Sequence, residues 1–217
     1  MTYPTPPWTL KGYAFQNFHW VKIEQVSAVI PKELEIVAIL PGKTLASVYF
    51  SAYTSGSVLE YNELIIAPAF VRYKNKTGSW ISHIYVDHPD SVAGGREIWG
   101  LPKEMADFTW TETGVTVSQN NRNLCNFYHK KGLFSTFWKQ KLSGNVLSGL
   151  ESDLLFFSSH FQSKLALVKG QVEIPNQSPF ANFELGQPFL SLSLPQLTLV
   201  TDAAEVVGKK SANIAVG

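Results

Sequence analysis

The 217-residue chain has little charge and a single cysteine. Aspartate, glutamate, lysine and arginine make up 16% of its residues, against about a quarter in typical soluble domains. Because Cys125 has no partner in the chain, an internal disulfide is excluded and a reducing, cytoplasmic compartment is expected. Low charge together with 45% apolar residues indicates extensive buried surface, and we expect a homo-oligomer.

The sequence also lacks an excess of charge of either sign. Eighteen basic residues stand against seventeen acidic ones, which gives a formal net charge of +1. Nucleic-acid binding requires a positive field that this balance does not supply. No run of about 18 apolar residues is present, and the first 20 residues contain no apolar signal-peptide core. The sequence therefore predicts neither nucleic acid nor a membrane as a partner.

Motifs for nucleotides, metals and nucleophilic serines are missing. The chain contains neither G-x-x-x-x-G-K-[ST] nor G-x-G-x-x-G, and G-x-S-x-G is absent. Its five histidines fall at unrelated spacings and no C-x-x-C accompanies them. We therefore expect no cofactor and no metal.

Short segments rich in aromatic and β-branched residues predict a mainly β protein of antiparallel strands in a barrel or packed sheets. The predicted strands are residues 47–56, 63–73, 79–88, 106–119, 123–140, 163–174 and 189–201. Helical spacing is rare. Residues 23–34 predict one short helix ending at Pro31, and residues 145–161 predict another. Without a repeat or a linker, residues 1–217 are interpreted as one domain.

One lysine stands in an unusual setting, the stretch "GGREIWGLPKEM" from Gly94 to Met105. Most lysines are solvated charges, but Pro102 removes a backbone donor before Lys103 and Trp99 supplies an apolar wall. Burial disfavours the charged form of an amine, and a neutral amine can form an imine with a ketone or an aldehyde. Lys103 is therefore a candidate nucleophile.

The same stretch resembles the signature of the acetoacetate decarboxylase family, in which Gly-Arg-Glu precedes a Pro-Lys whose lysine forms a Schiff base. Other stretches resemble the family in the same order: "YPTPPWTLKGYAF" near the start, "VIPKELEI", "YNELIIAPA", and "VEIPNQSPFANFEL" near the end. The resemblance spans most of the chain. It implies a β-rich α+β fold with few short helices, built of antiparallel sheets around a closed, cone-shaped barrel. It also implies a homo-oligomer and a lysine that points into an apolar cavity.

The resemblance assigns roles to individual residues. Lys103 falls on the Schiff-base lysine and Glu63 falls on the active-site glutamate, so both are predicted to be catalytic. Further residues are predicted to position or bind the substrate: Arg96, Glu97, Trp99 and Tyr61. For the arginine and the glutamate of the Gly-Arg-Glu element, the expected role is positioning or structural.

The chain departs from the family pattern at three positions. The decarboxylases have a second lysine after the reactive one, where this chain has Glu104. Acetoacetate decarboxylase is itself the established example of a lysine activated by desolvation or a cationic neighbour. Here desolvation must act alone, and Glu104 must face away from Lys103, as adjacent side chains in an extended segment do. The family's carboxylate-binding arginine and second glutamate align near Lys11 and Ser51, where neither type is present.

These features predict a Schiff-base-forming lyase that decarboxylates a β-keto acid through a lysine iminium. Neutral Lys103 would condense with the ketone, and Glu63 would move protons or anchor the substrate. A second interpretation keeps the imine but replaces decarboxylation by aldolase, dehydratase or cyclase chemistry on a larger oxo acid. A third is a non-catalytic β-barrel that binds an apolar ligand. In the first two the partner is a small-molecule oxo acid.

Overall fold

The computed structural model describes residues 3–210, the side chains of residues 131 and 133 excepted. Its helices are α1 (Ile23–Val26) and α2 (Pro89–Trp99), with 3-10 turns at Ser27–Val29 and Ala181–Phe183. Its strands are β1 (Trp8–Lys22), β2 (Glu35–Ile36), β3 (Lys43–Tyr53), β4 (Tyr61–Ala67), β5 (Ala69–Tyr73), β6 (Lys76–Trp80), β7 (His83–Val86), β8 (Lys103–Met105), β9 (Asp107–Thr111), β10 (Gly114–Gln119), β11 (Arg122–Ser135), β12 (Gln140–Leu150), β13 (Asp153–Ser163), β14 (Ala166–Glu173), β15 (Leu190–Thr201) and β16 (Glu205–Lys209). The mainly β class predicted from the sequence is confirmed.

The strands form one curved sheet with a branch. The main path runs β2-β5-β6-β12-β13-β15-β1-β3-β4-β7-β8, and a smaller sheet of β9, β10, β11 and β14 branches from β15. Most pairs are antiparallel, but β6 with β12 and β7 with β8 are parallel. Within residues 3–210 no pairing joins β2 to β8. The mainly antiparallel architecture is confirmed, while closure of the barrel stays a prediction.

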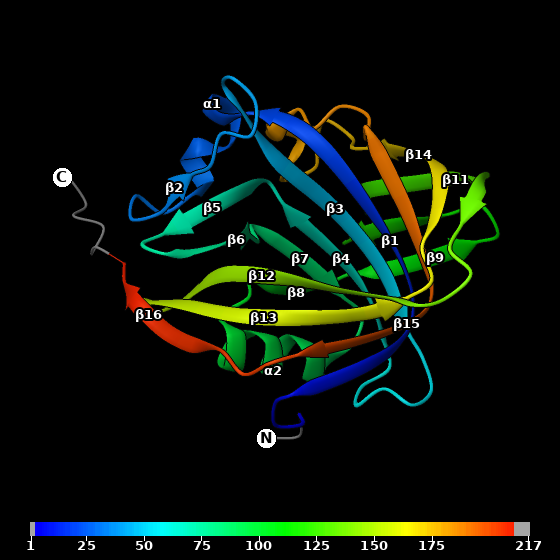
Figure 1. Cartoon of the computed structure of the whole chain (residues 1–217), viewed down its shortest axis with the longest axis horizontal. Coiled ribbons are helices and arrows are strands. Elements are labelled where there is room, and N and C mark those ends of the chain that lie inside the picture. The colour runs from blue at the N-terminus through cyan, green and yellow to red at the C-terminus, as the bar shows by residue number, and fades with distance from the viewer. Residues whose placement is uncertain (1–2, 211–217) are drawn as a thin grey trace.

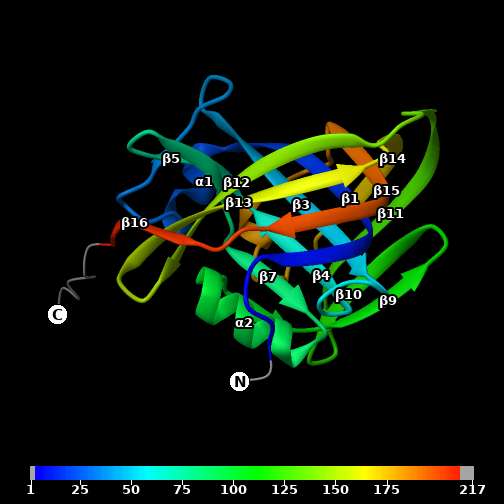
Figure 2. The same cartoon turned by 60° about the horizontal axis from the view of Figure 1, so that its bottom comes forward.

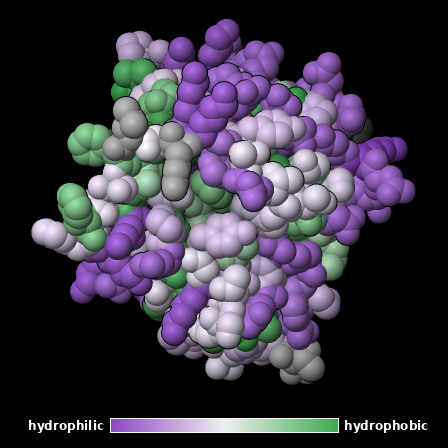
Figure 3. Space-filling model, turned by 90° about the vertical axis from the view of Figure 1, so that its right-hand side faces the viewer, coloured by the Kyte–Doolittle hydropathy of each residue, from purple (hydrophilic) through white to green (hydrophobic). Residues whose placement is uncertain are grey.

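Figures 1 and 2 show how these parts are arranged. The smaller sheet and the region of α1, β2 and β5 lie at opposite ends of the molecule, and α2 lies along one side of the main sheet. Hydrophilic side chains dominate the face at the end of the smaller sheet, with apolar groups between them (Figure 3). Among the described residues, no helix is long and apolar enough to cross a membrane.

Each predicted strand segment contains at least one strand, but the helix predicted at residues 145–161 is wrong. Those residues form the hairpin of β12 and β13, which turns at Glu151 with a φ of 48°. Leu147 and Leu154 coincide with a helical spacing, yet each is buried from a different strand of the hairpin. Pairing with β6 and β15 on either side outweighs the weak local helical signal.

Three elements at the site were not predicted as regular structure: β1, α2 and the short strand β8 that begins with Lys103. The long strand β1 follows Pro4, Pro6 and Pro7, which obscure its start in the sequence. The sequence nevertheless contains residues typical of both ends of the helix α2. The His88 side chain caps it by accepting from the Asp90 N–H, Pro89 occupies its first turn, and Gly100 ends it in the left-handed region at a φ of 58°.

Candidate active site

Lys103 is the first residue of β8 and points into the protein. Its exposed fraction is 3%, and it lies opposite Ile84 of the parallel strand β7. Glu104 is exposed on the other face of β8, where its carboxylate accepts a hydrogen bond of 2.9 Å from Gln119 Nε2. The condition that Glu104 faces away from the amine is therefore met.

The Lys103 amine has two polar partners. Its Nζ donates to Glu63 Oε1 at 2.8 Å and to Ser91 Oγ at 3.0 Å. Glu63 is 4% exposed, and its other oxygen, Oε2, accepts from the Tyr53 hydroxyl at 3.1 Å. Lysine and glutamate thus form a buried pair whose remaining hydrogen-bonding capacity is largely satisfied, the arrangement that a buried ion pair needs to be tolerated.

Several tyrosines surround this pair. The hydroxyls of Tyr49 and Tyr53 lie 3.3 Å apart, and the Lys103 Nζ lies 5.0 Å from the centre of the Tyr61 ring. Burial raises the pKa of the Tyr53 and Tyr61 phenols well above the ordinary value, and the Glu63 charge adds to the effect. Both phenols therefore stay protonated at neutral pH and act as neutral hydrogen-bond donors.

The helix α2 makes room for the lysine. Ser91 and Gly95 are four residues apart and hence on one face of α2. A Cβ at Gly95 would lie 2.6 Å from Lys103 Cε and still nearer its Cδ. Only glycine at this position leaves room for the Lys103 side chain as it lies here. The Gly-Arg-Glu element thus has a steric role in placing the amine.

We expect Gly95→Ala to slow imine formation at Lys103 by about 100-fold, because displacement of a reacting group by about 1 Å costs that much. Stability should change little, since alanine gains up to about 1 kcal/mol of helix propensity over glycine. The rate of borohydride-dependent adduct formation and the thermal midpoint measure the two effects. Gly42→Ala, in a turn with no atom within 4 Å of the new Cβ, is the control for the rate alone, because its φ of 70° strains alanine, and it should keep the wild-type rate. An unchanged rate in Gly95→Ala would contradict the steric role.

The arginine and glutamate of this element lie outside the pocket. Arg96 Nε donates to the backbone oxygen of Lys103 at 2.8 Å and so fixes the start of β8 from behind. Glu97 is exposed and accepts a hydrogen bond from the Tyr3 hydroxyl. Both are placed for a structural contribution, whereas the other predicted binding residues, Trp99 and Tyr61, line the cavity that holds Lys103.

That cavity has a volume of about 370 Å³. Its lining residues come mainly from β1, β3, β4, α2, β8, β12, β13 and β15. Apolar side chains make up most of its wall, including Trp8 and Trp99, which meet edge to face at 4.9 Å. Among the described lining residues, Lys103 and Glu63 are the charged ones.

The unmatched family positions are also visible. Ser51 is buried and lies directly opposite Glu63 in the β3–β4 register, but it carries no carboxylate. Gly12 of β1 packs so closely on the backbone of Ala52 that no side chain fits there, and Lys11 is exposed. No second cation therefore reaches the described cavity from the start of β1.

Sequence reasoning missed Ser91, Tyr53 and Tyr49. Recognition of α2 from its end signals would have placed Ser91 one turn before Gly95. Alternation along the predicted strand at residues 47–56 puts Tyr49 and Tyr53 on the same face, which is a signal that the sequence does carry.

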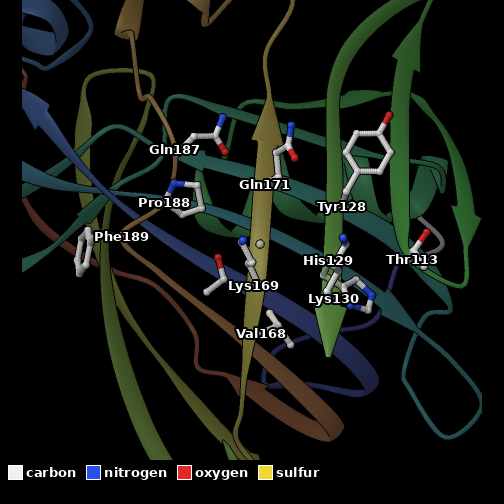
Figure 4. A pocket seen from close by; sticks show the side chains of 12 residues that line it. Thr113, Tyr128, His129, Lys130, Val168, Lys169, Gln171, Gln187, Pro188 and Phe189 are labelled. Atoms are coloured by element: carbon white, nitrogen blue, oxygen red, sulfur yellow. The ribbon is translucent and has the colours of Figure 1, made fainter. Parts of the chain in front are cut away.

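A larger groove of about 870 Å³ lies elsewhere, along β11 and β14 (Figure 4). Lys130 and Lys169 are directly opposite each other there, but both are exposed and no carboxylate lines the groove. Because no carboxylate lies beside these lysines in its described lining, this groove lacks the buried lysine–carboxylate pair that the smaller cavity has. Within the described part of the chain, no cluster of three or more His, Cys, Asp or Glu could hold a metal ion.

Comparison with known families and curated proteins gives a consistent assignment. The family model described as acetoacetate decarboxylase (ADC) matches residues 1–131. Protein NEOXANTHIN-DEFICIENT 1 of Solanum lycopersicum is 28% identical over 131 residues, which are 60% of this chain and 44% of that protein. Acetoacetate decarboxylase of Burkholderia vietnamiensis is 30% identical over 120 residues, which are 50% of this chain and 45% of that enzyme. The chain thus spans less than half the length of these curated relatives.

Solved structures show the same fold. Acetoacetate decarboxylase of Legionella pneumophila superposes with a TM-score of 0.76 at 17% identity, over 96% of this chain and 90% of that one. The enduracididine biosynthesis enzyme MppR complexed with pyruvate gives a TM-score of 0.66 at 14% identity, over 96% and 91% of the two chains. The mainly β fold of the acetoacetate decarboxylase structures, predicted from the resemblance, is confirmed, while closure of the barrel stays a prediction.

Proposed function

The chain belongs to the acetoacetate decarboxylase family, which includes lyases, and we propose that it is a lyase whose Lys103 forms a Schiff base with a β-keto acid and releases carbon dioxide. The observation that carries the proposal is the buried amine of Lys103, 2.8 Å from Glu63 Oε1 in an apolar cavity. Family membership supports it independently of the geometry.

Glu63 supplies the route to a neutral amine. Transfer of one proton from Lys103 Nζ to Glu63 Oε1 leaves the pair with no net charge, as before, so burial does not oppose it. The product is a neutral amine beside a neutral carboxylic acid. The ion pair and this neutral form can interconvert by that single proton transfer, without a change in net charge. In this proposal the transfer to Glu63 takes the place of the second lysine that the decarboxylases carry after the reactive one.

The covalent steps then follow. The Nζ lone pair attacks the ketone carbon to give a carbinolamine, and Glu63 returns its proton to the hydroxyl, which leaves as water. The resulting iminium accepts the electron pair of the breaking carbon–carbon bond as carbon dioxide departs. The enamine takes a proton from solvent at carbon, and water hydrolyses the iminium that results to release the ketone and free Lys103.

The apolar wall assists the bond-breaking step. With Lys103 committed to the iminium, no other cation lines the described cavity to hold the substrate carboxylate. A carboxylate in apolar surroundings is destabilised relative to neutral carbon dioxide. Tyr53 and Tyr61 provide neutral donors near the reacting atoms.

The same lack of a second cation favours one alternative function, imine chemistry without decarboxylation. An aldolase, dehydratase or cyclase needs the lysine and a proton carrier but not a departing carboxylate. MppR has been solved with the condensation product of pyruvate and imidazole 4-carboxaldehyde, which supports condensation chemistry on this fold.

The homo-oligomer and the cytoplasmic location stay predictions from composition.

Borohydride trapping tests the proposal. The protein is incubated with acetoacetate or pyruvate and sodium borohydride, and the adduct is mapped by peptide mass spectrometry. We expect a single reduced adduct on Lys103. An acetoacetate adduct that has lost the mass of carbon dioxide, together with released gas, indicates decarboxylation, whereas an intact adduct indicates the alternative. Absence of any adduct at Lys103 would leave only a non-catalytic binder of an apolar ligand.

A further inference from the structure

The cavity is too large for a four-carbon acid alone. At roughly 30 Å³ for each water molecule, its volume of about 370 Å³ would hold about twelve waters. This volume falls within the range of about 300–1,000 Å³ found for pockets that enclose drug-sized ligands. A small oxo acid condensed with Lys103 would occupy only one end of it.

The cavity extends away from the lysine. Besides the residues of α2, β4 and β8 around Lys103, its lining includes Leu142 of β12, Phe161 of β13 and Leu165, and the part that these three residues form is called the far end. The lining on β12 alone runs from residue 142 to residue 146, which corresponds to about 13 Å at ~3.3 Å per strand residue. A chain attached to the Schiff base can therefore run along the cavity toward β12.

The rest of the described lining carries no charge and is mainly apolar, although Gln16, Ser47, Ser143 and Asn145 add neutral polar groups to it. Phe18, Leu45 and Leu192 contribute to it, and no charged residue accompanies them among the described lining residues. A carboxylate or phosphate at that end would be desolvated without a cation, which is strongly unfavourable. An alkyl or isoprenoid-like chain would instead replace water along an apolar surface.

Outside the far end, apolar side chains continue onto the surface. Phe134, Phe137 and Trp138 are 74%, 86% and 75% exposed. The segment that carries them is joined to the cavity, because the Thr136 N–H donates to the Leu165 oxygen at 2.8 Å and the Leu165 N–H donates to Thr136 Oγ1 at 2.9 Å. Such a cluster of exposed aromatic groups is unusual on a soluble surface unless it contacts an apolar molecule.

We infer that the substrate carries its oxo group at one end of a long apolar chain, which lies along the cavity toward Leu142 and enters past the exposed aromatic segment. This inference rests on the proposed Schiff-base function of Lys103. It names a substrate class, chain-terminal oxo compounds with an apolar tail, and it sets that class apart from short oxo acids.

A series of methyl ketones of increasing length tests the inference without requiring decarboxylation. Acetone, methyl pentyl ketone and methyl nonyl ketone are each trapped on the protein with borohydride below their solubility limits. The concentration that gives half-maximal adduct formation at Lys103 is measured for each. We expect this half-maximal concentration to fall by about fourfold for each added methylene until the cavity is filled, because burial of each methylene adds binding free energy.

A matched pair of variants locates the tail. Leu142→Glu places a charge at the far end of the cavity, and Leu150→Glu places one on the same strand, β12, outside the cavity; the two leucines are 45% and 36% exposed. Leu142→Glu should weaken trapping of methyl nonyl ketone by at least tenfold relative to trapping of acetone. Leu150→Glu should leave the ratio of the two unchanged.

The outcomes separate the two proposals. Adducts at Lys103 that do not strengthen with chain length, or a chain-length effect that Leu142→Glu leaves intact, would overturn the inference about the tail and leave the Schiff-base function standing. Failure of every ketone and oxo acid to give an adduct would overturn the proposed function and the inference together.

Discussion

Replacement of Lys103 by methionine is expected to abolish both the trapped adduct and turnover. Methionine fills similar volume in the apolar cavity but offers no nucleophilic nitrogen, so no imine can form. Removal of a group that reacts covalently with the substrate lowers turnover by several orders of magnitude, here about 10⁴-fold or more. Adduct mass and carbon dioxide release are the measurements.

Lys103→Arg tests whether a positive charge at this position supports activity without a nucleophilic amine. The guanidinium keeps a cation beside Glu63 but stays protonated and cannot condense with a ketone. It should therefore be as inactive as the methionine variant. Lys32→Met, at an exposed lysine, should retain wild-type trapping. Adduct formation or turnover in Lys103→Arg would contradict the assignment of this amine as the nucleophile.

Disruption of the Lys103–Glu63 pair is expected to have the largest effect on stability. In Lys103→Met the Glu63 carboxyl group, 4% exposed, loses its cation, which costs about 3–5 kcal/mol for a buried pair. The double variant Lys103→Met with Glu63→Met should regain most of that loss, because well-packed apolar residues can replace a buried ion pair. Urea unfolding of wild type, both single variants and the double variant gives the coupling free energy.

The exposed pair Arg72–Glu35, with its closest atoms 3.3 Å apart, is the control for this cycle. Its side chains are largely solvated, and the corresponding methionine cycle should give a coupling of about 0–1 kcal/mol. A similarly small coupling for Lys103 and Glu63 would mean that the two groups do not interact in the folded protein. The proton route from Nζ to Oε1 would then be untenable.

The sequence by itself determined the local features of the site. Pro102 and the apolar residues around it indicated a buried Lys103, and strand alternation placed Glu104 on the opposite face. Aromatic and β-branched segments indicated the mainly β class, and the Gly-Arg-Glu and Pro-Lys spacing indicated the family. All of these depend on residues close together in the chain, where steric and solvation preferences act directly.

Only the tertiary structure decided which groups meet. Glu63 and Lys103 are 40 residues apart and come within 2.8 Å because β4, β7 and β8 pair side by side. Ser91 joins them because α2 packs against β8, and residues 145–161 form a hairpin because the neighbouring strands pair with it. The cavity likewise exists between strands from both halves of the chain. Such contacts depend on the free energy of pairing distant segments, which the local sequence pattern does not specify.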